Sequence, residues 1–294
     1  LAAHNDFLFI FGKKQILVYS GASTPASLVL SDTVGSIGCI ARDTIQSIGT
    51  DVVFLSDSGV RSLMRTIQEK SAPLRDLSKN VRFDLESSLA GETLANVKSV
   101  YSEKNAFYLL VLPATLQVYC FDTKQSLQDG ASRVTKWDSI APTSLRSLRN
   151  GDLLIGKNGF IGKYGGYIDD TTTYRFAYYT NNADLGNPNQ ISVLKTISAI
   201  VIGGSNQFLT INWGFDYSGA YQAQNIYIPT QVSYEYGTAE YGTAEYTSGI
   251  PIKTLRANAS GAGKIVQTGY ETTINGTQLS LQKIEIQAKD GKMA

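Results

Sequence analysis

The first half of the chain repeats one arrangement of apolar and polar positions: a polar turn, an apolar strand, a second turn and another apolar strand. It occurs at four places, over residues 5–19, 50–63, 105–121 and 150–164. The residues that begin the four copies are Asp6, Asp51, Asn105 and Asp152. Their spacings along the chain are 45, 54 and 47 residues. A four-stranded propeller blade has about this length, so the pattern predicts β-propeller-like blades.

Residues 69–96 depart from this strand pattern. Their apolar side chains recur at steps of three and four, which is the spacing of one face of a helix. The residues on this face are Leu74, Leu77, Val81, Leu85 and Leu89. Asp76 or Ser78 is the predicted cap of this helix, and Gly91 its predicted end. A small helical insertion therefore explains the longest of the three spacings.

The blade spacing does not continue through the last part of the chain. Segments rich in Asp, Asn, Thr and Gly, which are typical of linkers, lie at residues 169–173 and 181–189. We therefore predict a first, platform-like domain over residues 1–180 and a second, antiparallel β domain over residues 181–294. The expected fold is all-β: propeller-like blades with a helical insertion, followed by a β-sandwich-like domain.

A five-residue repeat, Glu-Tyr-Gly-Thr-Ala, lies within residues 232–249. Because side chains alternate between the two sides of a strand, an odd period places successive tyrosines on opposite sides. The repeat therefore predicts a protruding loop or a bulged hairpin. Tyrosine buries a large area at low entropic cost. The candidate contacts between subunits are therefore Tyr234, Tyr236, Tyr241 and Tyr246. A flexible surface loop produced by repeat slippage is the alternative.

Charge is sparse and unevenly distributed. Charged residues make up 17% of the chain and the net charge is +1, which favours neither a nucleic-acid-binding surface nor an acidic shell. Basic side chains outnumber acidic ones over residues 133–163, and the reverse holds over residues 169–245. Opposite charges favour head-to-tail contact between copies, with Arg146 and Arg149 as candidate contacts. Solvated loops without a partner are the alternative.

The side chains that most catalytic and metal sites require are scarce. His4 is the only histidine, so neither a Ser-His-Asp triad nor a zinc site is predicted. Cys39 and Cys120 are isolated in the sequence and are interpreted as buried free thiols. Residues 260–264 lack the full pattern of a phosphate-binding loop and indicate a glycine-rich turn. We expect no catalytic residues, cofactor or metal, and no apolar run has the length of a membrane span.

Two groups of segments resemble the tail-nozzle (tail tubular protein B) and tail-stabilisation families of short-tailed phages. The segments similar to the propeller blades of these families are residues 34–42, 48–56 and 59–63. The segments similar to the β domain that follows the propeller are residues 183–186, 195–197, 211–213, 279–286 and 289–292. The resemblance covers most of the chain and consists of pattern, without a diagnostic motif.

The resemblance implies a structural protein of the virion, located in the phage tail. Such proteins form a ring, usually of six copies, below the portal and adaptor, and the genome leaves through the central channel. The implied partners are copies of the chain itself, the tail adaptor protein, tail fibres or spikes, and genomic DNA in passage. The resemblance transfers no catalytic residue. The chain is short beside many nozzle proteins, so blades or the nozzle tip are expected to be reduced.

Four repeats are few for a closed propeller. We therefore expect residues before Leu1, or strands from the second half of the chain, to complete it. Because passing DNA must not adhere, the basic side chains of residues 133–163 are expected to face a neighbouring protein and not the channel. The turn at residues 57–59 and the abundant tyrosine favour an alternative function, a propeller-type protein that binds or hydrolyses glycans.

Overall fold

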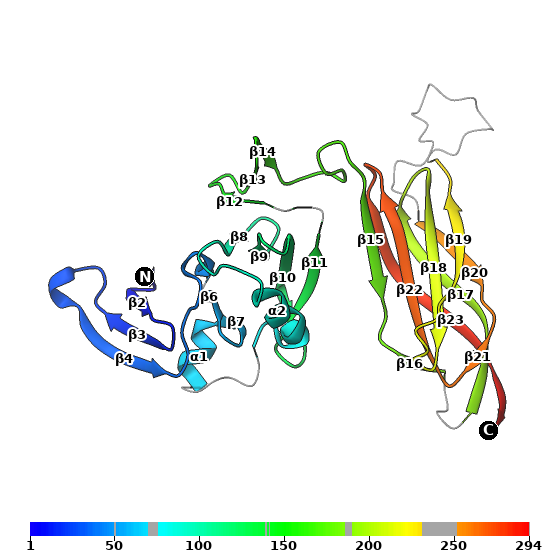
Figure 1. Ribbon diagram of the computed structural model, residues 1–294, viewed down its shortest axis with the longest axis horizontal. Coiled ribbons are helices and arrows are strands. Elements are labelled where there is room, and N and C mark those ends of the chain that lie inside the picture. Colours follow the sequence, from blue (N-terminus) through cyan, green and yellow to red (C-terminus); the bar gives the residue numbers. More distant parts are fainter. Residues whose placement is uncertain are drawn as a thin grey trace. The chain divides into compact units, whose positions relative to one another are not determined.

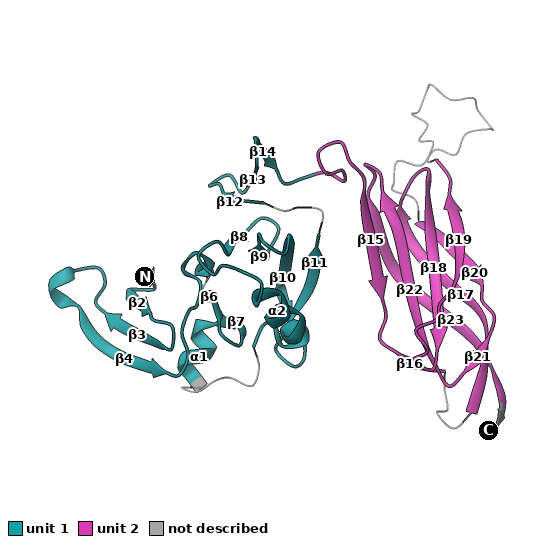
Figure 2. Cartoon of the chain, viewed as in Figure 1, with its two compact units in different colours: residues 1–165 teal, residues 166–294 magenta. Residues whose placement is uncertain are grey.

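The computed structural model of the chain describes residues 1–49, 51–69, 76–138, 140, 142–185, 190–230 and 252–293. Antiparallel strands dominate it, and the prediction of an all-β protein is confirmed (Figure 1). The chain divides into two compact units, residues 1–165 and residues 166–294 (Figure 2).

In its described residues, unit 1 forms four antiparallel sheets, each built from strands that are consecutive in the chain. Sheet I contains β1 (Ala2–His4), β2 (Phe7–Phe11), β3 (Gln15–Ser20) and β4 (Val29–Gly35). Sheet II contains β5 (Gln46–Ile48), β6 (Asp51–Ser56) and β7 (Gly59–Ser62). Sheet III contains β8 (Lys98–Ser102), β9 (Phe107–Leu112), β10 (Gln117–Ser126) and β11 (Ser132–Trp137). Sheet IV contains β12 (Ser144–Ser147), β13 (Leu153–Lys157) and β14 (Phe160–Lys163).

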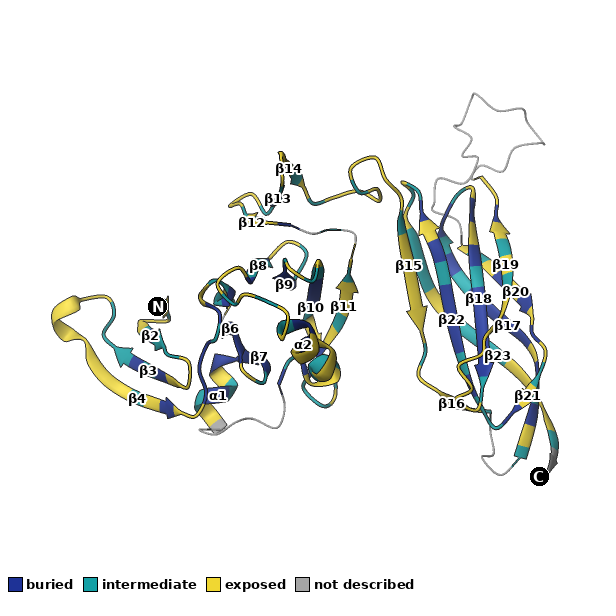
Figure 3. Ribbon diagram, in the orientation of Figure 1, coloured by how far each residue is buried: buried dark blue, intermediate teal, exposed yellow. Residues whose placement is uncertain are grey.

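Sheet II is covered on both faces. Successive side chains of a strand point to opposite sides of its sheet. On β6, Val52 and Phe54 join a core cluster with residues of sheet I, such as Ile16. Val53 and Leu55 join a second cluster with residues of sheet III. This is why β6 is an almost continuous apolar run that is buried along nearly its whole length (Figure 3).

Sheet III is covered in the same way. On β9, Tyr108 and Leu110 pack toward sheet II, whereas Leu109 and Val111 pack toward sheet IV. Sheets I to IV therefore stack face to face in chain order, as consecutive blades do. Within the described residues the series is open, since no core cluster joins sheet I to sheet IV.

The helical insertion differs from its predicted extent. Helix α1 (Leu63–Glu69) begins directly after β7, before the predicted start of the insertion at residue 69, and α2 (Arg82–Leu89) follows the 3-10 turn η3 (Lys79–Val81). The described members of the predicted apolar face all pack against the cluster shared by sheets II and III; they are Leu77, Val81, Leu85 and Leu89. Leu74 lies outside the described residues. No helix within the described ranges is long and apolar enough to cross a membrane.

The two predicted caps, Asp76 and Ser78, form a buried link to sheet II instead. The Asp76 carboxylate pairs with the guanidinium of Arg82. The Ser78 hydroxyl donates to Asp76 Oδ1 at 3.1 Å and accepts the backbone N–H of Val60 at 3.0 Å. Gly59 has φ +117°, and a Cβ there would lie 2.1 Å from the same hydroxyl. Only glycine therefore fits this turn against the insertion.

Unit 2 is a sandwich of two sheets, and the prediction of a β-sandwich-like domain is confirmed. Sheet V has the order β15 (Tyr174–Tyr179), β22 (Ile265–Ile274), β18 (Gln207–Phe215) and β19 (Gln222–Ile228), with β16 (Ala183–Asp184) also paired to β22. Sheet VI is built on β17 (Gln190–Gly203), which pairs with β20 (Ile252–Asn258), β21 (Ala262–Gly263) and β23 (Leu279–Met293). One core cluster, including Ile197, Ile211 and Tyr270, lies between the two sheets.

The second unit begins earlier than the predicted boundary at residue 180. Strand β15 pairs with β22 along its whole length, from Tyr174 opposite Ile274 to Tyr179 opposite Gly269. The segment before residue 180 is therefore part of the sandwich. All described strands of unit 2 pair with one another, so the expected contribution of its strands to the blades is not observed among the described residues.

Candidate functional site

The first strands of sheets I to IV lie side by side within unit 1. The Ser47 hydroxyl of β5 is 3.0 Å from Nδ1 of His4 on β1. Gln46 of β5 donates from Nε2 to the backbone oxygen of Ser99 on β8 at 3.1 Å. Strand β12 in turn contacts β8. We call this row of β1, β5, β8 and β12 the inner edge, since it joins the first strands of the four sheets.

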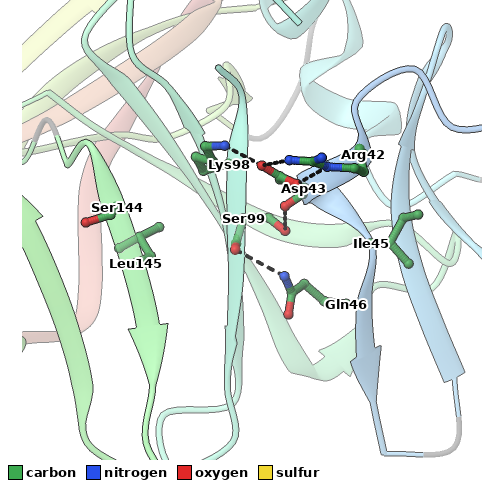
Figure 4. A pocket seen from close by; sticks show the side chains of 8 residues that line it. All are labelled: Arg42, Asp43, Ile45, Gln46, Lys98, Ser99, Ser144 and Leu145. Carbon is green, nitrogen blue, oxygen red and sulfur yellow. Dashed lines mark hydrogen bonds and ion pairs between the residues drawn. The ribbon is translucent and has the colours of Figure 1, made fainter. Parts of the chain in front are cut away.

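A cleft of about 380 Å³ opens on the inner edge between β5, β8 and β12 (Figure 4). The 3-10 turn η2 (Arg42–Thr44), which precedes β5, contributes Arg42 and Asp43 to its lining. In Figure 4, Arg42 and Lys98 point toward Asp43 from opposite sides. The cleft is lined by Arg42, Asp43, Ile45, Gln46, Lys98, Ser99, Ser144 and Leu145.

Asp43 holds both cations of the cleft. Arg42 Nε donates to its Oδ1 at 2.7 Å, and the Lys98 ammonium pairs with its Oδ2. The hydrogen bonds from Arg42 and then Lys98 lower the pKa of Asp43 from 3.8 to about 2. Ser99 donates from Oγ to the backbone oxygen of Asp43 at 3.1 Å, which ties η2 to β8. The single carboxylate offsets half of the positive charge of the two cations. The cleft offers hydroxyl, amide and cationic donors to a polar partner.

Arg146 and Arg149, the predicted contact residues, are exposed near one end of the sheet series. Arg146 lies on β12 and Arg149 in the turn that follows. Leu145 packs toward sheet III, so its neighbour Arg146 projects from the opposite, outer face of sheet IV. Neither guanidinium bonds to another residue in the part of the chain that the structure describes. Their role as contacts stays a prediction.

The other predicted contact residues fall within the tyrosine repeat. Tyr234, Tyr236, Tyr241 and Tyr246, and the whole of residues 232–249, lie outside the described residues. Their role as contacts therefore also stays a prediction.

The two cysteines are buried free thiols, as predicted. Burial raises the pKa of Cys120 to about 12, and it also raises the pKa of Cys39. The Cys39 thiol donates to the backbone oxygen of Ala41 at 3.0 Å. Because the thiolate is the reactive form, neither side chain is activated for nucleophilic attack.

Side chains at and just before the turn at residues 57–59 bond to Arg61, a buried residue that the sequence analysis did not single out. Arg61 donates from Nε to Ser56 Oγ at 3.0 Å and from Nη2 to Ser58 Oγ at 2.7 Å. The turn hydroxyls are therefore engaged within the fold. No described group of three or more His, Cys, Asp or Glu side chains has an arrangement that would hold a metal ion.

The glycine-rich segment at residues 260–264 is also tied into the fold. Asp216 accepts the backbone N–H groups of Lys264 and Ile265 through Oδ1, at 2.9 and 3.1 Å. The backbone oxygen of Ser260 accepts the indole N–H of Trp213 at 2.9 Å. Its interpretation as a turn agrees with these contacts, since it joins β20 to β22 and includes the short β21.

The most informative feature of the site that sequence reasoning missed is the pairing of Asp43 with Lys98. The two residues are 55 positions apart, and neither stands in a recognisable motif. Acidic residues next to turns are common, so no local signal distinguishes Asp43 from its neighbours.

No protein-family model and no curated protein matches the chain. Among solved structures, a Bacillus thuringiensis Cry1Da tryptic core variant is 14% identical, with 94% of this chain and 48% of that chain covered at a TM-score of 0.21. A structure of manganese lipoxygenase of Gaeumannomyces graminis with part of zonadhesin of Komagataella pastoris is 8% identical. That match covers 98% of this chain and 93% of that chain at a TM-score of 0.16. This chain spans about half the length of the Cry1Da core. Both TM-scores are too low to indicate a shared fold.

Proposed function

We propose that the protein is a structural component of a phage tail, a nozzle or hub subunit that forms a ring around the genome-ejection channel below the portal and adaptor. The observation that supports this most is the inner edge of unit 1. Four sheets stack face to face while their first strands β1, β5, β8 and β12 lie side by side. In a propeller, blades placed in this way surround the axis of that one domain, and the proposal is that such domains from several copies assemble around the genome channel.

The charges on the inner edge suit a wall past which DNA moves. A strongly basic wall would retain DNA, because each neutralised phosphate contributes to binding. Here Asp43 is bonded to both Arg42 and Lys98, so the cleft has only a small net positive charge and is not strongly basic. Arg146 and Arg149 are exposed and are available to an acidic neighbouring protein.

The proposal has defined partners. They are further copies of the chain, six in the expected ring, together with the tail adaptor protein and tail fibres or spikes. Genomic DNA passes the inner edge without lasting contact, and the protein resides in the virion. The proposal assigns no catalytic residue and no cofactor.

Assembly state tests this proposal directly. Native mass spectrometry and cryo-electron microscopy of tail particles should reveal a ring of this chain with the inner edge toward its lumen. Replacing both Arg146 and Arg149 by glutamate should weaken ring formation, whereas the same change at the exposed Lys124 and Lys195 should leave it intact. A protein that remains monomeric in particles that contain it would show the proposal to be wrong.

The alternative, a propeller-type protein that binds or hydrolyses glycans, depended largely on the turn at residues 57–59. In the structure, the hydroxyls of Ser56 and Ser58 bond to Arg61. No observation on unit 1 therefore favours this alternative over the ring subunit.

A further inference from the structure

The outer face of sheet V, which points away from the sandwich core, carries two pairs of exposed aromatic rings. Tyr179 and Tyr221 form an edge-to-face pair with ring centroids 5.5 Å apart. Phe208 and Tyr227 form a tilted pair at 5.1 Å. These four side chains are between 38% and 57% exposed. Exposed aromatic side chains gathered on one face commonly mark a binding surface.

Strand alternation explains why these rings share one face. On β18, Leu209 and Ile211 point into the core, so Phe208 and Asn212 point outward. Asn212 lies opposite Gly269 of β22, and Gly269 lies opposite Tyr179 of β15. The two aromatic pairs are therefore about four residues apart along the sheet, or roughly 13 Å at about 3.3 Å per residue.

Two glycines let the rings of the first pair approach the sheet closely. A Cβ on Gly269 would lie 2.3 Å from the ring of Tyr179, and a Cβ on Gly214 would lie 3.1 Å from the ring of Tyr221. Each ring therefore lies in a place that a larger side chain would fill. The two rings therefore lie close against the outer face of the sheet.

Polar groups fill the space between the two aromatic pairs. Arg175 Nη2 pairs with Glu271 Oε2 at 2.7 Å, and the hydroxyl of Tyr179 also donates to Glu271. These bonds, from Tyr179 first and then Arg175, lower the pKa of Glu271. Thr210 donates to Asn225 Oδ1 at 2.8 Å. The polar side chains are thus already held in place before any ligand arrives.

The face is hollowed at its Phe208 end. A cavity of about 350 Å³ lies there, and its lining includes Arg175, Thr210 and Glu271 together with Asn206 and Asn275 from the adjoining turns. Phe208 is its aromatic lining side chain and the rest of the lining is polar, so the hollow can accept a ligand that forms hydrogen bonds.

We propose that the outer face of sheet V binds an extended, neutral oligosaccharide. The C–H groups on the face of a sugar ring carry slight positive charge and pack against the negative face of an aromatic ring. Sugar hydroxyls both donate and accept, which matches the carboxylate, guanidinium and amide groups between the rings. The separation of the two aromatic pairs fits a chain of several sugar rings better than a single one.

Two features favour a neutral glycan over other ligands. Arg175 and Glu271 cancel each other in charge, so the face has no preference for an anionic or cationic ligand. Their position between the aromatic pairs also differs from the centre of a typical protein interface, which is depleted in charged residues. This inference concerns unit 2 alone and does not depend on the proposed ring.

Isothermal titration of the full chain with cellohexaose, maltohexaose, xylohexaose and chitohexaose tests the proposal. At least one of these sugars should bind at concentrations up to about 5 mM, which detects even weak sites. Phe208→Ala and Tyr221→Ala should each weaken that binding about tenfold, as expected for the loss of an aromatic anchor. The control Phe83→Ala removes a ring that is 87% exposed in unit 1 and should leave binding unchanged.

Circular dichroism of each variant establishes that the sandwich is still folded. Lack of binding to all four sugars would overturn the proposal, as would binding that survives both Phe208→Ala and Tyr221→Ala in folded protein. If the wild-type chain binds no sugar but Phe208→Ala abolishes assembly with another protein, the face is a protein contact and the proposal is wrong.

Discussion

Replacing Leu85 by alanine is expected to destabilise unit 1 selectively. Leu85 lies in α2, has no exposed surface, and packs into the cluster between sheets II and III. The helix is held by Asp84, whose Oδ2 accepts the hydroxyl of Tyr119 at 2.7 Å. Because this bond restrains α2, the helix cannot move far enough to fill the space left by the lost side chain.

The expected loss is about 3 kcal/mol, within the range of roughly 2–5 kcal/mol seen for buried leucine-to-alanine changes. With a urea dependence of about 2 kcal/mol per molar, the unfolding midpoint of unit 1 should fall by about 1.5 M. The assay is urea denaturation followed by tryptophan fluorescence, because Trp137 reports on unit 1 and Trp213 on unit 2.

The same helix provides the control, since the ring of Phe83 is 87% exposed. Phe83→Ala removes more atoms than Leu85→Ala but should change the midpoint little, because its ring is already in water. The transition reported by Trp213 should be unaffected by either change. A shift below about 0.3 M for Leu85→Ala, or an equal shift for Phe83→Ala, would refute the reasoning that α2 closes this core.

Three further predictions concern other parts of the chain. The pKa of Asp43 falls from 3.8 to about 2 on folding, so its contribution to stability is present above the unfolded pKa and is lost as pH falls through about 2. Asp43→Asn should therefore reduce the loss of stability between these pH values in acid titrations followed by circular dichroism. Gly269→Ala should destabilise unit 2 by about 1–3 kcal/mol, measured by thermal unfolding, because its methyl group would displace the ring of Tyr179. Cys39 and Cys120 should not react with a thiol reagent in the native protein but should both react in urea; rapid native reaction would contradict their burial.

Strands were predicted most reliably where the local pattern was strong. The apolar run at residues 52–55 lies in a predicted strand segment, and the structure places it between two other sheets. By contrast, the helical insertion was predicted to begin at residue 69, whereas α1 (Leu63–Glu69) begins at the end of the predicted strand segment 50–63. A short apolar run fits either structure, and its contacts with the rest of the fold decide between them.

Features that depend on distant residues were not predictable in the same way. The segment Tyr174–Tyr179 was assigned to the first domain, whereas its pairing with residues 269–274 makes it part of the second. The bond between Asp43 and Lys98 and the shared face of Tyr179 and Phe208 also join residues far apart in the chain. In none of these cases does the sequence around one residue indicate which distant residue is its partner.

The sequence by itself determined the all-β class, most of the strands and turns, the two-part organisation and the buried state of both thiols. These properties depend on alternation and turn residues within a few positions of each other. The tertiary structure alone decided which strands share a sheet, which faces stack, and which side chains meet at the inner edge and on sheet V. Strand pairing uses backbone groups that every residue carries, so the partner of a strand is decided by the packing of the whole unit.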